Sequence, residues 1–100
     1  MALRIWKWQL AMAAQQDLGL PLGAQFLTLQ LQDDNPTLWF LCETDAPLQL
    51  RRFAIHGTGQ DVPDTFRQYL GTFQTGALVW HVFEVLHPSR IPLEPQRIDL

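Results

Sequence analysis

Cysteine and charge are both scarce in this sequence of 100 residues. Its one cysteine, Cys42, cannot form an internal disulfide, which fits a reducing compartment, and its strand context indicates a small buried hydrophobe. Charged residues make up 17% of the chain and hydrophobic residues 47%. An average globular protein has about 25% charged residues, and disordered chains have more charge and fewer apolar residues than this one. We therefore expect the chain to fold as one small domain.

Long apolar runs and basic clusters are also missing. No window approaches the roughly 18 uncharged apolar residues of a membrane span, and residues 1–8 lack the uninterrupted apolar core of a signal peptide. The net charge is −3, and only Arg51 and Arg52 are adjacent among the scattered basic residues. Because binding to a nucleic-acid backbone needs a basic stripe, we expect a cytoplasmic protein that binds neither a membrane nor such a backbone.

Residues that build catalytic and metal sites are few. The only serine is Ser89, and no flanking motif supports Cys42 as a nucleophile beside either His56 or His81. The three histidines, of which His87 is the third, do not have the spacing that places two metal ligands on one element. We therefore expect no metal, no cofactor and no enzymatic activity.

What the sequence does have is strand-like alternation, interrupted by turn residues about every ten positions. The predicted strands cover residues 3–10, 24–32, 37–43, 48–56, 66–74 and 77–86, and residues 17–20 are either a connection or a further short strand. Six or seven short strands predict a mainly β fold, a compact antiparallel sandwich or barrel, over residues 1–86. Residues 87–100 are predicted to be an extended tail that contains prolines.

The clearest pattern is a hairpin formed by residues 24–32 and 37–43. Alternation places Leu27, Leu29 and Leu31 on one face of its first strand, and the run Asp33-Asp34-Asn35-Pro36 favours a turn. In the later strand 66–74, Gly71 marks a possible bulge.

The strand 77–86 is apolar on both faces, which is typical of a strand between two layers or one half covered by a partner subunit. Its His81 is expected to be hydrogen-bonded in the core or at an interface. Its Glu84 either pairs with an arginine or emerges at the strand end, and the second interpretation is favoured. Four tryptophans are many for a monomer of this size, so a homo-oligomer is expected. The predicted interface residues are Trp6, Trp8, Trp80, Val82 and Glu84.

The best candidate for a ligand contact is the segment from Arg51 to Gly59. It combines the guanidinium groups of Arg51 and Arg52, the imidazole of His56, and backbone N–H groups of a glycine loop, all of which suit an anion. The loop residues are Gly57, Thr58 and Gly59. The segment is neither a Walker loop nor a dinucleotide fingerprint, and a strand with solvated arginines that ends in a glycine turn is the simpler interpretation.

Three stretches resemble a family of small phage and prophage proteins of unknown function. They read Phe-Ala-Ile-His-Gly-Thr-Gly from residue 53, Tyr-Leu-Gly-Thr-Phe-Gln from residue 69, and Gly-Ala-Leu-Val-Trp-His-Val-Phe-Glu from residue 76. The likeness covers residues 1 to about 86. It implies no reaction or ligand, only expression inside bacteria.

That setting favours a non-enzymatic protein that binds a host protein stoichiometrically, such as an inhibitor of bacterial defence of the anti-CRISPR kind. Two alternatives stay open. One is an oligomeric sponge that sequesters a nucleotide immune signal near Arg51, Arg52 and His56. The other is a structural or assembly accessory protein of the phage particle.

Overall fold

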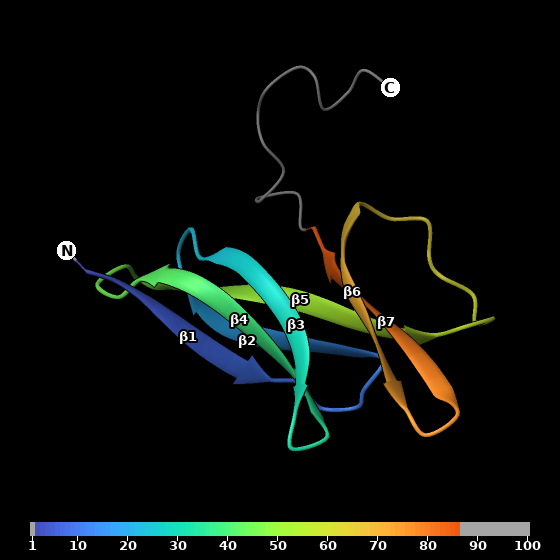
Figure 1. Cartoon of the computed structure of the whole chain (residues 1–100). Coiled ribbons are helices and arrows are strands. Elements are labelled where there is room, and N and C mark those ends of the chain that lie inside the picture. The colour runs from blue at the N-terminus through green and yellow to red at the C-terminus, as the bar shows by residue number, and fades with distance from the viewer. Residues whose placement is uncertain (1, 87–100) are drawn as a thin grey trace.

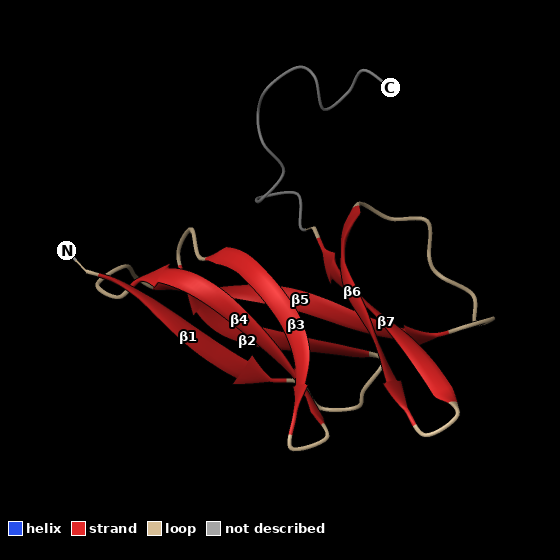
Figure 2. Cartoon of the chain, viewed as in Figure 1, coloured by secondary structure: helices blue, strands red, loops and turns tan. Residues whose placement is uncertain are grey.

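The computed structural model describes residues 2–86, which form seven strands and no helix (Figure 2). The strands are β1 (Leu3–Gln9), β2 (Gln15–Pro21), β3 (Gln25–Gln32), β4 (Asn35–Glu43), β5 (Leu48–Gly57), β6 (Arg67–Thr75) and β7 (Leu78–Val85). The predicted tail, with Ser89 and His87, lies outside the described residues.

The strands form two antiparallel sheets that pack face to face (Figure 1). One sheet has three strands in the order β1-β4-β3, and the other has four in the order β2-β5-β7-β6. The predicted β-rich antiparallel fold is therefore confirmed, and the two separate sheets identify it as a sandwich rather than a barrel. β2 extends over Gln15–Pro21, so the short strand expected near residues 17–20 exists and is longer than predicted.

Alternating residues of the central strands fill the space between the sheets. Phe40 from β4 and Phe53 from β5 are both fully buried, with ring centroids 6.2 Å apart and planes inclined by 67°. Each buried phenylalanine contributes about 1.5–3 kcal/mol of hydrophobic stabilisation. Leu38 and Cys42 on β4 and Val82 on β7 are also fully buried, which confirms the prediction for the thiol of Cys42.

The β3–β4 hairpin is tighter than its composition suggests. Gln32 pairs with Asn35, so only Asp33 and Asp34 form the turn, with φ angles of 51° and 64°. Two successive residues with positive φ are typical of a type I′ turn, whose twist matches that of the flanking strands. Pro36, expected in the turn, therefore belongs to β4.

Two bulges change which side chains face inward. In β3, Phe26 pairs with Phe40 and Thr28 with Trp39, so Leu27 is the extra residue. The prediction that Leu27 shares a face with Leu29 is wrong, because the bulge turns Leu27 to the outer surface. In β6 the register shifts between Tyr69 and Gly71, which makes Leu70 the extra residue beside the glycine expected at the bulge.

The two long sides of the sandwich differ. On one side β3 contacts β6, and a Cβ at Gly71 would lie only 3.0 Å from Leu29 Cδ2. On the other side, β1 and β2 are the outer strands of their sheets and do not pair with each other. Within residues 2–86 there is no helix long and apolar enough to span a membrane.

Candidate binding surface around strand β1

The free edge of β1 is set by its pairing with β4. Leu10 N donates to Pro36 O and Thr44 N donates to Ala2 O, so even-numbered residues of this strand form the hydrogen-bonded pairs. In an antiparallel ladder these pairs alternate with pairs whose backbone groups point away from the partner strand. The N–H and C=O groups of residues 3, 5, 7 and 9 therefore point outward, and no described residue bonds to them.

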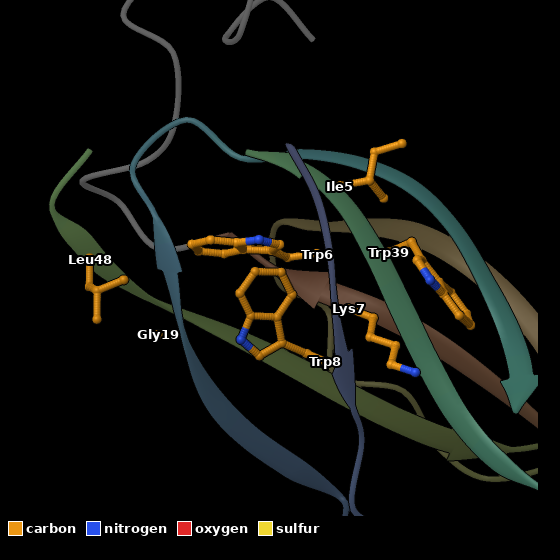
Figure 3. Close-up of a pocket in the computed structure, with 7 residues that line it drawn as sticks. All are labelled: Ile5, Trp6, Lys7, Trp8, Gly19, Trp39 and Leu48. Atoms are coloured by element: carbon orange, nitrogen blue, oxygen red, sulfur yellow. The ribbon is translucent and has the colours of Figure 1, made fainter. Parts of the chain in front are cut away.

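A groove runs beside this edge, between β1 and the other sheet. Figure 3 shows Trp6 and Trp8 directed from β1 toward Gly19 on β2 and Leu48 on β5. The groove has a volume of about 580 Å³. Trp8 lies edge-on to Phe40 with centroids 5.6 Å apart, and Trp6 lies edge-on to Trp8 at 6.3 Å. This arrangement anchors Trp8 on the core and leaves Trp6 39% exposed in the groove wall.

The outer face of the three-stranded sheet is apolar around Ile5 and Trp39. Ile5 is 60% exposed and Leu27 is 43% exposed, and together with Trp39, Thr28 and Gln30 they line a shallow hollow of about 280 Å³. We call the side chains of Leu3, Ile5, Leu27 and Trp39 the outer apolar face. Exposed apolar surface of this kind marks contact sites in proteins.

Lys7 lies on the same face and its side chain reaches across the sheet. Its Nζ donates to Gln32 Oε1 at 2.6 Å, although β3 and β1 are separated by β4. The ammonium group of Lys7 is therefore directed away from the free edge of β1.

The structure divides the predicted ligand segment between the core and the surface. Arg51 is only 6% exposed, and its Nε and Nη2 donate to the two carboxylate oxygens of Glu84 at 2.7 and 2.8 Å. Its Nη1 donates to Ala24 O at 2.6 Å. Arg51 therefore does not contribute to a surface anion site, because its guanidinium is used inside the protein.

Glu84 corrects a second expectation. At 2% exposure it does not emerge at the strand end, and the pairing with an arginine, which was the less favoured interpretation, is correct. Val82 is fully buried within the same chain, so neither residue is available as an interface contact. Trp80 is half-buried, and its Nε1 donates to Thr75 Oγ1 at 3.0 Å.

Arg52 and His56 lie on the outer face of the four-stranded sheet, but they belong to separate clusters. Arg52 forms two hydrogen bonds to the carboxylate of Asp17, at 2.8 and 3.2 Å, which raise the pKa of its guanidinium. The ring of His56 lies 6.0 Å from that of Phe83, which also contacts Tyr69 at 5.5 Å. Each of the two side chains thus already has a neighbour in the protein.

The glycine loop has fewer available donors than predicted. Gly57 N donates to Gln60 Oε1 at 2.9 Å and Thr58 N donates to Val79 O at 3.1 Å. With the N–H groups of Gly57 and Thr58 already bonded within the protein, the loop is a weaker anion cradle than predicted.

His81 is hydrogen-bonded, as predicted, through both ring nitrogens, but it lies on the outer face of the four-stranded sheet and not in the core. Nε2 is 2.8 Å from Thr58 Oγ1 and Nδ1 is 2.9 Å from Thr72 Oγ1, and Tyr69 Oη bonds to the same Thr72 hydroxyl. No sequence pattern predicts this chain of hydrogen-bonded side chains, because its members come from β6, β7 and the loop after β5.

These positions do not assemble a nucleophile and a base. Burial raises the pKa of the Cys42 thiol. Its hydrogen bond to the backbone of Trp6 and the charge of Arg51 lower the pKa, but by less than burial raises it. Cys42 faces the core from β4, whereas His81 and His56 lie in β7 and β5 beside outer-face residues. Among residues 2–86, no group of three His, Cys, Asp or Glu side chains is arranged to hold a metal ion.

Sequence reasoning missed the residues of the outer apolar face and two that line the groove: Leu3, Ile5, Leu27 and Trp39, and Gly19 and Leu48. The alternation of residues 3–10 does place Ile5 opposite the tryptophans, but it cannot show that no other part of residues 2–86 covers that face. Leu48 and Gly19 reach the groove only because the edges of two sheets lie side by side.

Comparison with known proteins gives one match. The model of a family described as Domain of unknown function (DUF7352) matches residues 1–91. The comparisons with curated proteins and with solved structures find no match.

Proposed function

The chain belongs to the DUF7352 family, and because the description of that family assigns no activity, we propose from the geometry that it is a non-enzymatic binding protein. It acts by stoichiometric contact with another protein, which covers the outer apolar face.

The observation that supports this proposal is the exposure of that face. Leu3 and Ile5 are 66% and 60% exposed on β1, and the bulge in β3 adds Leu27 beside Trp39. Burying apolar surface contributes about 25 cal/mol for each Å² removed from water. A partner with an apolar patch of matching shape would gain this free energy without the entropy cost of ordering a flexible segment, because the residues of the outer apolar face already lie on paired strands.

The same geometry argues against a role in catalysis. The Thr58–His81–Thr72 chain lies on an open sheet face, where water has access to the reacting groups. Catalytic groups work best where a site excludes water and holds them around a substrate. Cys42, the strongest nucleophile by type, is fully buried.

The resemblance to phage and prophage proteins suggests the class of partner. A protein made inside an infected bacterium meets host proteins, and inhibition by occlusion needs only a surface, not a reaction. We therefore propose a protein of the host defence machinery as the partner. The nucleotide-sponge alternative depends partly on Arg51, and the burial of Arg51 removes one of the two arginines that would bind the nucleotide.

The test is co-purification of the tagged chain with bacterial proteins, followed by an infection assay. Ile5→Glu places a charge in the outer apolar face, and Leu78→Glu places one at a residue that is also 60% exposed but belongs to the four-stranded sheet. The proposal expects one defence protein to be retained at a fixed stoichiometry, retention and phage protection to be lost in Ile5→Glu, and both to persist in Leu78→Glu. It is overturned if no defence protein is retained, if both variants behave alike, or if the chain co-purifies only with virions.

A further inference from the structure

We propose that β1 pairs antiparallel with β1 of a second copy of the chain, around a two-fold axis at Trp6. The pairing joins the two three-stranded sheets into one continuous six-stranded sheet. It goes beyond the proposed function, because it concerns the free edge of β1 rather than the outer apolar face.

β1 differs from the other three edge strands because it contains neither a proline nor a bulge. β2 ends in Pro21, and β3 and β6 each contain a bulge. Proteins use prolines and bulges to prevent one sheet edge from adding to another. β1 has neither, and its seven residues pair with β4 without a register shift.

The outward backbone groups of β1 select the register. Residues 3, 5, 7 and 9 present their N–H and C=O groups to the free edge, and in an antiparallel pair such residues must lie opposite one another. A two-fold axis at Trp6 places Ile5 opposite Lys7 and Leu3 opposite Gln9, so all four outward residues are matched. An axis at Ile5 would leave Gln9 unmatched, and an axis at Lys7 would leave Leu3 unmatched.

In this register, the side chains of one copy are complementary to the side chains that they face on the second copy. On the groove side, Trp6 lies opposite Trp6 of the second copy, and Arg4 lies opposite Trp8. A guanidinium is attracted electrostatically to the face of an indole ring, and this contact occurs twice by symmetry. The groove of about 580 Å³ next to Trp6 provides room for the second indole.

The charges of β1 do not oppose the pairing. The side chain of Lys7 is held across the sheet by Gln32, away from the edge. Arg4 of each copy lies opposite Trp8 of the other copy, so the two arginines are four residue positions apart along the paired strands and do not face each other. A second copy of the chain supplies a cation for Trp8 and an indole for Trp6, which is why we assign the edge to self-association.

The expected dimer is weak. A seven-residue strand edge with two central indoles buries less than the roughly 800 Å² per partner of a standard interface. We therefore expect the chain to be monomeric at low concentration and dimeric at high micromolar concentration.

Sedimentation equilibrium of the full chain over this concentration range tests the proposal, with Lys7→Pro and Lys7→Ala as a matched pair. Both variants lose the bond to Gln32, but only proline removes the outward N–H, and an edge strand tolerates such a proline because that N–H is not used within the fold. The parent and Lys7→Ala should dimerise alike and Lys7→Pro should stay monomeric at every concentration. A parent that is monomeric throughout, or a Lys7→Pro variant that dimerises like Lys7→Ala, overturns the proposal.

A cross-link tests the position of the axis even if Lys7→Pro does not fold. Residues facing each other in a pair that is not hydrogen-bonded have Cα atoms about 4.5 Å apart, within reach of a disulfide. Under mild oxidation, Trp6→Cys should give a covalent dimer and Trp8→Cys should not. Equal cross-linking of both variants, or of neither, contradicts the register. Sedimentation and cross-linking measure self-association, whereas retention in the co-purification measures the partner protein, so failure of the dimer leaves the proposed function intact, and the reverse also holds.

Discussion

Arg51 and Glu84 form a bidentate ion pair in the interior, between the second and third strands of the four-stranded sheet. The side chains are 6% and 2% exposed, and the Arg51 guanidinium also lies 5.1 Å from the centre of the Phe40 ring in the opposite sheet. One arginine thus contacts a carboxylate in its own sheet, an aromatic ring in the other, and the carbonyl of Ala24 between them.

Removing one member of this pair should destabilise the fold strongly. In Glu84→Gln, the Arg51 charge loses its counter-ion while remaining buried, and breaking a buried pair in this way costs about 3–5 kcal/mol. Urea unfolding followed by tryptophan fluorescence should show a large drop in midpoint. The double variant Arg51→Met/Glu84→Leu should be more stable than Glu84→Gln, because it leaves no unpaired charge.

The control is the pair between Arg52 and Asp17, which has the same chemistry at the surface. Its side chains are 51% and 39% exposed, so solvent screens the attraction. Asp17→Asn should leave the urea midpoint unchanged. Equal changes in the urea midpoint for Asp17→Asn and Glu84→Gln would show that burial does not determine how strongly the loss of the Arg51–Glu84 pair destabilises the fold.

Adding a methyl group at Gly71 should disturb the contact between the two sheets. The new Cβ would lie 3.0 Å from Leu29 Cδ2 and 3.3 Å from Leu29 Cβ. Overpacking of this kind costs about 1–3 kcal/mol, which thermal unfolding of Gly71→Ala should show. At Gly19 the nearest atom, Leu48 Cδ1, is 3.9 Å away, so Gly19→Ala should be neutral or slightly stabilising. A Gly71→Ala variant as stable as Gly19→Ala would contradict the close approach.

The β3–β4 turn should accept glycine with a gain in stability. Asp34 has φ of 64°, a conformation that costs a residue with a side chain about 1–2 kcal/mol and glycine almost nothing. Part of this gain is offset by the larger entropy of glycine in the unfolded chain, so Asp34→Gly should stabilise by less than that amount. Asp34→Val should destabilise, because a β-branched side chain fits this conformation poorly. The order of melting temperatures, Gly above Asp above Val, checks the turn type.

Stability should fall at alkaline pH because of Cys42. Burial raises the pKa of its thiol in the folded state above the ordinary value of 9.0. Below that value both states keep the proton and the thiol contributes no pH dependence. As the pH rises past it, the unfolded chain releases the proton before the folded one, so unfolding becomes more favourable. The urea midpoint of the parent should therefore fall more steeply above pH 9.0 than that of Cys42→Ala. Identical slopes would mean that the thiol ionises equally in both states.

Sequence reasoning succeeded for strands that keep the same alternation from end to end, without a bulge. The strands around Phe53 and Val82, and the burial of Cys42, follow from alternation and apolar content. It failed at Leu27, because a single extra residue in β3 reverses the faces without changing the composition. It also failed at Arg51, because an arginine on an alternating strand is ordinarily solvated, and its partners Glu84 and Ala24 come from distant parts of the chain.

The candidate surface was predictable only in part. The pattern of residues 3–10 places Trp6 and Trp8 together, and both line the groove. The edge position of β1 could not be deduced, because strand order depends on how distant segments pair. Val82 and Glu84 were chosen as interface residues since a strand apolar on both faces suggests a partner, yet the other sheet of the same chain covers them.

The pairing of β1 with β4 also sets a delay during synthesis. The β3–β4 and β6–β7 hairpins close over two-residue turns, so each can form within microseconds once its strands are made. Leu3, however, pairs with Glu43, and at ribosomal rates the intervening residues take about 2–8 s to produce. Throughout that interval the nascent chain carries the indoles of Trp6 and Trp8 and the aliphatic groups of Leu3 and Ile5 on an unpaired strand, so this N-terminal segment exposes both its apolar side chains and its backbone N–H and C=O groups before it becomes part of a sheet.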